Sequence, residues 1–243
     1  PTQLSYAGKL SDEDLLEARR KNRKIFRELV KVSTGVELEE DRLTIGFARR
    51  FATYKRANLV FHDLDKLREI GAGKIQFVFS GKAHPRDEGG KQLIRDIYGS
   101  AKHLEKEIPV AFLENYDMET GLAITSGVDI WLNNPVRPME ASGTSGMKAA
   151  MNGVPNCSIL DGWWPEGCQH GVNGWAIGGP EDSRDDDRDA NNIYSVLEND
   201  VIPTWEKGGE IWATIMRSSI ATSARFTGAR MISEYKRFYD SFE

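Results

Sequence analysis

A run of small residues between an acid and a lysine has the composition of a ligand-binding loop. The segment PMEASGTSGMKAAMNG, residues 138–153, contains Glu140 near its start and Lys148 further on. The small residues between them are Ala141, Ser142, Gly143, Thr144, Ser145 and Gly146. Small residues allow tight bends and close approach to a ligand, and a loop that runs into a helix presents N–H groups to phosphate. Residues 149–151 favour such a helix, with Lys148 in its first turn. We therefore predict an anion site with an amine beside it.

A cluster of basic residues follows the first predicted strand. The segment FARRFATYKR contributes Arg49, Arg50, Lys55 and Arg56. A solvated helix face is the ordinary interpretation of such a run, but its place at a strand end favours anion binding. Lys82 and His84 in SGKAHP follow a second strand, and Tyr116 in FLENY follows a third. The ring of Tyr116 could stack on a ligand or simply pack against its neighbours.

Short apolar segments and helix-like stretches must position these residues. The apolar segments are LTIGFA from Leu43, IQFVFSG from Ile75, PVAFLEN from Pro109, VDIWLNN from Val128 and NCSILDG from Asn156. Most are continuous apolar runs, which is typical of parallel strands covered on both faces. Helix-like stretches at residues 57–73 and 88–107 separate the early segments. The pattern predicts a doubly wound α/β sheet whose ligands bind beyond the carboxyl ends of the strands.

Both ends of the chain are predicted to be helical. Residues 11–33 form a predicted helix with Ser11 as its N-cap and acids in its first turn. The apolar stripe of this helix would be Leu15, Ala18, Ile25, Leu29 and Val32. The last third of the chain predicts helices that pack an apolar face, and the charged residues 180–192 predict an exposed loop.

Composition excludes several classes of function. The formal net charge of −5 argues against nucleic acid as the main partner, because such domains usually carry a basic excess. No apolar run approaches the roughly 18 residues of a membrane span. Cys157 and Cys168 form no metal-binding pattern and predict reduced thiols in a cytoplasmic protein. We expect no metal.

Taken in order, these segments resemble the C-terminal domain of an α-glucan phosphorylase. The match runs through ARRFATYKR, GKAHP, FLENY, EASGTSGMKAAMNG and LDG to the terminal ARFTGARMISEYKRFY. Of these, EASGTSGMK is highly specific. The segment DGWWPEG resembles the shorter bacterial and archaeal branch of the family. The chain departs from the larger phosphorylases at Ala52, Asp117 and the pair Ser145 and Gly146.

The resemblance implies a fold, a cofactor and a reaction. The fold would be the Rossmann-like C-terminal half of the two-domain GT-B glycosyltransferase architecture, and the cofactor would be pyridoxal 5′-phosphate (PLP). The reaction would transfer glucosyl from an α-1,4-glucan such as maltodextrin to inorganic phosphate, with retention, to give α-glucose 1-phosphate. In this family the 5′-phosphate of PLP lies near the substrate phosphate as a proton relay. Two phosphates held close together require fixed cations and N–H donors.

The resemblance also implies roles for single residues. Lys148 would form a Schiff base with PLP, Arg50 would bind the substrate phosphate, and Glu140 would bind the neutral sugar. The expected cofactor-binding residues are Lys148, Arg49, Lys55, Tyr116, Thr144, Ser145 and Gly146. The expected substrate-binding residues are Arg50, Glu140, Ala141, Ser142 and Gly143. The expected catalytic residues are Lys148, Arg50 and Lys55.

From the resemblance we also expect a division of the chain. Residues 1–40 would be a helical linker, residues 41–200 the PLP-binding core, and residues 201–243 helices on the same domain. The other wall of the cleft would come from a missing N-terminal domain of the same enzyme. We therefore predict that the chain folds but is inactive alone. Whether the chain forms a homo-oligomer is left open.

Two other readings stay open at this point. A nucleotide-sugar glycosyltransferase such as glycogen synthase shares the architecture but lacks a cofactor lysine at the position of Lys148. An inert carbohydrate-binding domain could stack sugars on Trp163 and Trp164, although core packing is the commoner role of such residues.

Overall fold

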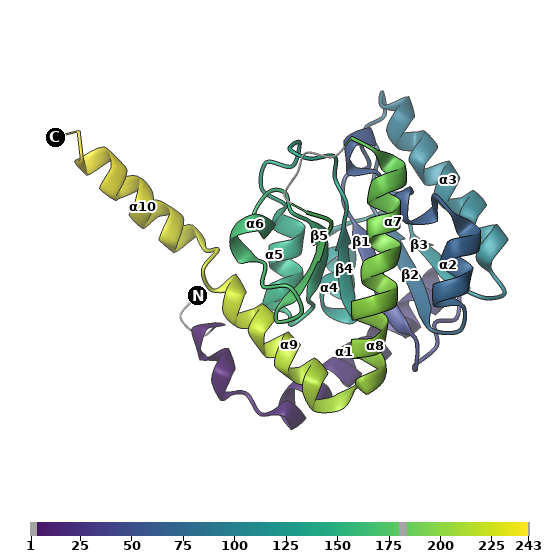
Figure 1. Ribbon diagram of the computed structural model, residues 1–243, viewed down its shortest axis with the longest axis horizontal. Helices are drawn as coiled ribbons and strands as arrows, with labels where there is room; N and C mark the ends of the chain where they lie inside the picture. Colours follow the sequence, from purple (N-terminus) through teal and green to yellow (C-terminus); the bar gives the residue numbers. More distant parts are fainter. Residues whose placement is uncertain (1–3, 180–183, 243) are drawn as a thin grey trace.

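The computed structural model describes residues 4–179 and 184–242, and a six-stranded parallel sheet lies at its centre (Figure 1). Its strands are β1 (Leu43–Ala48), β2 (Ile75–Ser80), β3 (Val110–Leu113), β4 (Ile130–Asn133), β5 (Asn156–Ile159) and β6 (Gly174–Ile177). They lie in the order β3-β2-β1-β4-β5-β6, and each neighbouring pair is parallel. This order confirms the predicted doubly wound, Rossmann-like sheet. The first five strands match the predicted apolar segments, whereas β6 was not foreseen.

The helices cover both faces of the sheet. The α-helices are α1 (Asp12–Thr34), α2 (Leu64–Gly71), α3 (Glu88–Leu104), α4 (Met118–Gly127), α5 (Thr144–Met151), α6 (Trp164–Gly167), α7 (Asp186–Val196), α8 (Ile202–Lys207), α9 (Gly209–Ser223) and α10 (Gly228–Asp240). Short helical turns are η1 (Leu4–Lys9), η2 (Thr53–Lys55), η3 (Leu59–Phe61) and the π-helical η4 (Leu197–Val201). Side chains from α2, α3 and α7 form one core layer, and those from α1, α4 and α5 form another.

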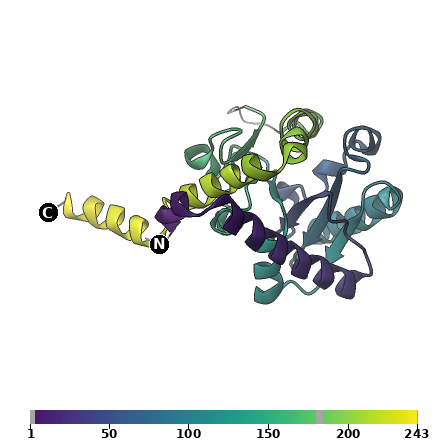
Figure 2. The ribbon, with the colours of Figure 1, turned by 90° about the horizontal axis from the view of Figure 1, so that it is seen from below.

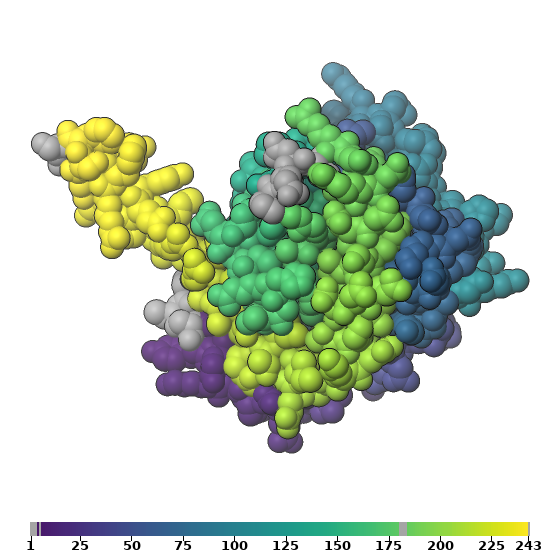
Figure 3. Space-filling view, in the orientation of Figure 1, coloured from purple at the N-terminus to yellow at the C-terminus, as the bar shows by residue number. Residues whose placement is uncertain are grey.

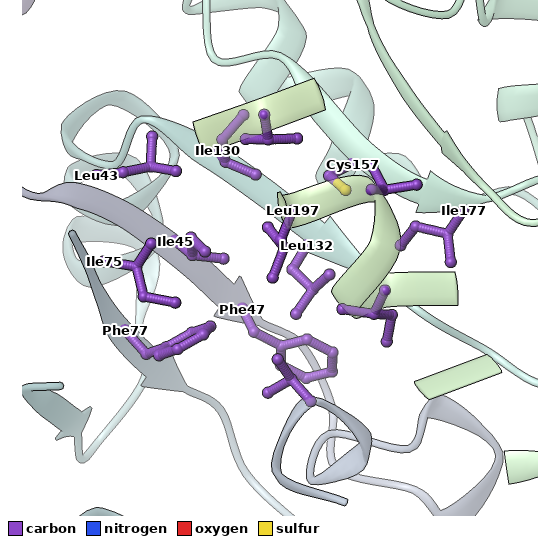
Figure 4. Packing of buried hydrophobic residues seen from close by; sticks show 14 of the residues in the cluster. Leu43, Ile45, Phe47, Ile75, Phe77, Ile130, Leu132, Cys157, Ile177 and Leu197 are labelled. Atoms are coloured by element: carbon purple, nitrogen blue, oxygen red, sulfur yellow. The ribbon is translucent and has the colours of Figure 1, made fainter. Parts of the chain in front are cut away.

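Alternate residues of β1, β2, β3 and β4 supply the two core layers. Leu43, Ile45 and Phe47 of β1 pack in the larger cluster, part of which Figure 4 shows. Ala48 of the same strand packs with Val78 in the other cluster. Because successive side chains point to opposite faces and both faces are covered, every residue of β1 is buried. This is why the strand sequences are continuous apolar runs instead of alternating ones.

Helix α1 begins as predicted but buries a different stripe. Ser11 Oγ accepts a hydrogen bond from the main-chain N–H of Asp14 at 3.1 Å, which confirms the N-cap. The buried residues of the helix are Leu15, Arg23, Phe26 and Val30. Leu15 is buried and Leu29 is partly buried against the core, whereas Ala18, Ile25 and Val32 are exposed, so the predicted stripe was wrong at these three residues. Arg19 and Arg23 lie on the inner side and form ion pairs with buried Asp129, which an apolar stripe could not reveal.

The acidic segment at residues 180–192 is only partly the predicted loop. Residues 180–183 lie outside the described residues, and α7 begins at Asp186, after the N-cap Asp185. Asp189 and Ala190 are buried because this part of the helix packs on the domain. A carboxylate run at a helix start is favourable, since it faces the positive end of the helix dipole. The loop prediction was therefore wrong from Asp186 onward.

The C-terminal helices differ in how they pack. Helix α9 runs beside α1 (Figure 2) and buries Trp212, Ile215 and Met216. Helix α10 has no buried residue and stands away from the body of the molecule (Figures 1 and 3). Within the described part of the chain, no helix has the length and apolar character needed to span a membrane.

Candidate functional site

Two loops that carry most of the predicted site residues leave the sheet where its winding direction changes. From β1 the chain proceeds outward to β2 and β3, and from β4 it proceeds the other way to β5 and β6. In open α/β sheets the loops at the carboxyl ends of two such strands diverge, and ligands usually bind in the crevice between them. Two loops meet there. The N–H of Val136 donates to the carbonyl oxygen of Tyr54 at 2.7 Å.

A buried cluster of two cations and one carboxylate occupies this crevice. Nη2 of Arg49, the residue after β1, lies 2.6 Å from Oε2 of Glu140 in the loop after β4. Nζ of Lys55, at the end of η2, lies 2.9 Å from the same oxygen. Arg49 also donates to Oδ1 of Asn133 at the end of β4. Arg49 and Lys55 are each 7% exposed and Glu140 is 9% exposed, so water screens these charges poorly.

The two cations and one carboxylate leave this cluster with a net positive charge, which favours an anionic ligand. Burial lowers the pKa of the Arg49 guanidinium, whereas the nearby charge of Glu140 and its hydrogen bond raise it. Two cations share one carboxylate oxygen. Buried charges need partners to offset their lost hydration, so the cluster is suited to a phosphate, which accepts several charge-assisted hydrogen bonds.

A second loop holds the backbone of Glu140. Oδ2 of Asp161 accepts the main-chain N–H of Glu140 at 2.9 Å, and Oδ1 accepts the N–H of Gly162 at 2.9 Å. The N–H of Trp163 donates to the carbonyl oxygen of Ser142 at 2.9 Å. The sequence pointed to Asp161 only as part of LDG. The available signal was a carboxylate placed directly after a strand.

Helix α5 starts in the small-residue loop, as predicted. Gly143 is its N-cap with φ at 79° and supplies no side-chain capping hydrogen bond. The buried Oγ of Ser145 has no hydrogen-bond partner among the described residues. A Cβ added to Gly146 would lie 2.3 Å from Oδ1 of Asn156, so only glycine fits there. Because the helix begins at Thr144, Lys148 lies in the second turn and not in the first.

Lys148 and Tyr116 line a common cavity of about 510 Å³. The other lining residues are Asp117, Met118, Gly121, Leu122, Thr125, Met151 and Asn152, from α4, α5 and their flanking turns. Lys148 is exposed and Tyr116 is half-buried, and burial raises the pKa of the Tyr116 phenol. The cavity therefore places a primary amine beside an aromatic ring and apolar side chains.

The remaining basic residues are either exposed to solvent or buried in contacts that hold the fold together. Arg50 is exposed at the strand end. Arg56 is buried, and its guanidinium donates to the carbonyl oxygens of Asn134 at 3.1 Å and Pro135 at 2.9 Å. Its ion pairs with Asp186 and Asp189 tie the loop to α7. Lys82 and His84 are exposed. Arg49 and Lys55 alone among these residues contact Glu140.

The aromatic pair Trp163 and Trp164 is part of the core. Trp163 is 4% exposed and Trp164 is 1% exposed, and the two rings pack together with Phe226. The Nε1 of Trp164 donates to the carbonyl oxygen of Trp175 at 3.2 Å. Neither ring offers a face on which a sugar could stack. The packing interpretation of the pair is confirmed.

The residues present fit a pyridoxal phosphate. Its aldehyde requires a primary amine, and Lys148 lies in a partly apolar cavity of suitable character. Its phosphate requires cations and N–H donors, which Arg49, Lys55 and the uncapped start of α5 can supply. The unpartnered Oγ of Ser145 adds a polar group near that helix start.

Comparison with known proteins identifies relatives of the chain. Residues 6–166 match the family model described as carbohydrate phosphorylase. A maltodextrin phosphorylase of Thermococcus litoralis is 46% identical over 252 residues, which covers 95% of this chain and 30% of that protein. A glycogen phosphorylase of Aquifex aeolicus is 45% identical over 219 residues, covering 86% and 32%. A glycogen phosphorylase of Mycobacterium tuberculosis is 41% identical over 210 residues, covering 81% and 24%. The chain thus spans between about a quarter and a third of these relatives.

Proposed function

This chain belongs to the carbohydrate phosphorylase family, and on that premise we propose that it is the PLP-binding portion of an α-glucan phosphorylase. The complete enzyme would transfer a glucosyl unit from an α-1,4-glucan to inorganic phosphate and release α-glucose 1-phosphate. Names of the relatives, maltodextrin phosphorylase and glycogen phosphorylase, support this class of substrate. The chain would form the C-terminal half of a GT-B architecture.

The observation that carries the proposal is the buried pair Arg49 and Lys55, which contact Glu140 in the loop that leads into α5. Fully buried cations are rare unless they are paired or bind a ligand. Here they face the loop that contains Glu140 and leads, through Gly143, into the helix that bears Lys148. We assign the two cations, the start of α5 and the Lys148 amine to one site for a phosphorylated aldehyde.

Within this site the side chains would take separate roles. Arg49, Lys55, Thr144, Ser145 and Gly146 would hold the cofactor phosphate, and Tyr116 would lie beside its ring. Arg50, exposed at the mouth of the crevice, would bind the substrate phosphate. Glu140 and the backbone from Ala141 to Gly143 would form hydrogen bonds with sugar hydroxyls. Asp161 would hold the main chain of Glu140 in place.

The chemistry requires positive charge near two phosphates. When bound, PLP would supply its 5′-phosphate as a proton relay to the substrate phosphate. Arg49, Lys55 and Arg50 would offset the repulsion between the two anions, which is large in a site with little water. A glucosyl group with oxocarbenium character must also be shielded from water. That shielding would come from an N-terminal portion of the complete enzyme, since this chain spans only between about a quarter and a third of its relatives.

The two other readings are less well supported. The family match favours a phosphorylase over a nucleotide-sugar glycosyltransferase. A binding domain that stacks sugars on Trp163 and Trp164 would need exposed rings, and both are buried.

A cytoplasmic location is supported by the two free cysteines, since reduced thiols are typical of that compartment.

A spectroscopic titration tests the proposal. PLP added to the chain should show saturable binding with one cofactor per chain, seen as a change in its near-ultraviolet absorbance. Pyridoxal, which lacks the phosphate, should bind far more weakly because Arg49 and Lys55 then have no ligand. Equal binding of the two compounds, or no saturable binding of either, would contradict the proposal. Lys236→Ala, at an exposed lysine of α10, is the matched control and should bind PLP normally.

A further inference from the structure

One carboxylate oxygen contacts both cations of the candidate phosphate site. Oε2 of Glu140 lies 2.6 Å from Nη2 of Arg49 and 2.9 Å from Nζ of Lys55. In the proposed function, these cations hold a phosphate while Glu140 binds a neutral sugar. The two roles use the same atoms. A phosphate oxygen placed between Nη2 of Arg49 and Nζ of Lys55 would displace the Glu140 oxygen, because that position holds one anionic oxygen.

The backbone of Glu140 is fixed while its side chain can exchange partners. Its N–H is held by Oδ2 of Asp161 at 2.9 Å, and the following loop is held by the bond from Trp163 to Ser142 at 2.9 Å. Rotation about the side-chain bonds of Glu140 alone can move its carboxylate away from the two cations. A phosphate offers more charge and more acceptor oxygens than a carboxylate, so it can displace Glu140 without leaving Arg49 or Lys55 unpaired.

We propose that the Glu140 carboxylate occupies the phosphate site as an internal anion that a phosphate group can displace. This inference rests on the proposed function. A phosphate group displaces the carboxylate from Arg49 and Lys55, and the released carboxylate becomes available to a sugar hydroxyl. Phosphate and sugar then bind with positive coupling, because the first ligand frees a group that the second one uses. Glu140 also keeps the two cations paired when no phosphate lies between them, which avoids isolated buried charge.

The test compares phosphate binding to the chain and to Glu140→Gln. The neutral amide keeps the size of the side chain but no longer competes as an anion. PLP and inorganic phosphate should each be tried, since either phosphate could be the displacing group. We expect Glu140→Gln to bind at least one of them about tenfold more tightly or better, which corresponds to about 1.4 kcal/mol. Pyridoxal, which has no phosphate, should bind the two proteins alike.

Matched variants make the result decisive. Glu114→Gln removes one negative charge at the end of β3, where Glu114 accepts from Tyr98 at 3.0 Å and contacts neither cation. It should leave phosphate affinity unchanged. Glu140→Asp keeps the charge but shortens the reach, so it should also tighten phosphate binding, by a smaller factor. If thermal melting shows that Glu140→Gln is unfolded, the phosphate affinity of Glu140→Asp is compared with that of the unmodified chain instead.

The outcomes separate this inference from the proposed function. Unchanged or weaker phosphate affinity in the folded Glu140 variants would overturn the exchange, while PLP binding to the unmodified chain would still support the cofactor site. Equal tightening by Glu114→Gln and Glu140→Gln would also overturn it, because a general charge effect would then explain the gain. Absence of phosphate-dependent binding to the unmodified chain would overturn the proposed function, and this inference with it.

Discussion

The main-chain N–H of Glu140 donates to the Asp161 carboxylate at 2.9 Å, which joins the loop after β4 to the loop after β5. Asp161 is 7% exposed and also accepts the N–H of Gly162 at 2.9 Å. One buried side chain thus satisfies two backbone donors in the loops that form the crevice. The position of the Glu140 carboxylate over Arg49 and Lys55 depends on this contact.

Replacement of Asp161 should destabilise the chain. Asp161→Ala leaves two backbone N–H groups without their acceptor, and an unsatisfied buried donor costs about 1–3 kcal/mol. We expect a loss of about 2–4 kcal/mol in the free energy of unfolding, measured by urea denaturation. Asp161→Asn retains one acceptor oxygen and should lose less. An unchanged urea midpoint for Asp161→Ala would show that these bonds do not hold the loop.

The basic residues should affect cofactor binding unequally. Lys55→Ala should weaken PLP binding by about 1.5–3 kcal/mol, the range for hydrogen bonds to charged groups. Arg50→Ala should leave PLP affinity nearly unchanged, because Arg50 is exposed and is assigned to the substrate phosphate. Absorbance titration of the two variants decides the matter. Equal losses would mean that the two phosphate positions are divided wrongly.

The sheet and its crevice were predictable from the sequence, because continuous apolar runs mark parallel strands and fix where their carboxyl ends lie. The missed β6, Gly174–Ile177, begins with a glycine and is followed by Gly178 and Gly179, a composition that indicates a turn. The stripe of α1 was misjudged because Arg19 and Arg23 occupy its inner side, where Asp129 pairs with them. Charged residues on one face of a helix ordinarily indicate that this face is exposed to solvent.

The contacts within the site were less predictable. Arg49 and Glu140 lie 91 residues apart in the chain, and their residue types alone predict a phosphate contact for one and a sugar contact for the other. The ion pair between them depends on the neighbouring positions of β1 and β4 in the sheet. Side-chain pairing over such separations follows from tertiary structure and not from local sequence.

The thiol of Cys157 should make stability sensitive to alkali. The side chain is fully buried, and burial raises its pKa far above the ordinary thiol value of 9.0. The native thiol therefore stays protonated while the unfolded one loses its proton, so stability is full below pH 9 and falls as the pH rises further. The slope for one proton is about 1.4 kcal/mol per pH unit.

Cys157→Ala provides the comparison. Its free energy of unfolding should fall less steeply than that of the unmodified chain between about pH 9 and pH 10.5, by up to the slope of one proton. Urea denaturation at several pH values measures both slopes. Equal slopes would indicate that the Cys157 thiol ionises in the native state.

The chain by itself should not carry out phosphorolysis. It spans between about a quarter and a third of its relatives, and without further protein to cover the glucosyl group water would compete with phosphate for it. Assays with maltodextrin, inorganic phosphate and PLP should yield no detectable glucose 1-phosphate. Robust turnover by these 243 residues would show that the site needs no further domain, or that a second copy completes it.

The central claim, that Lys148 is the residue that binds the cofactor aldehyde, is tested most directly by chemical trapping. The chain is incubated with PLP, reduced with borohydride, digested and mapped by mass spectrometry. We predict one pyridoxyl adduct, on the peptide that contains Lys148, and its loss in Lys148→Ala. Adduct formation on another lysine, or none in excess PLP, would contradict the account.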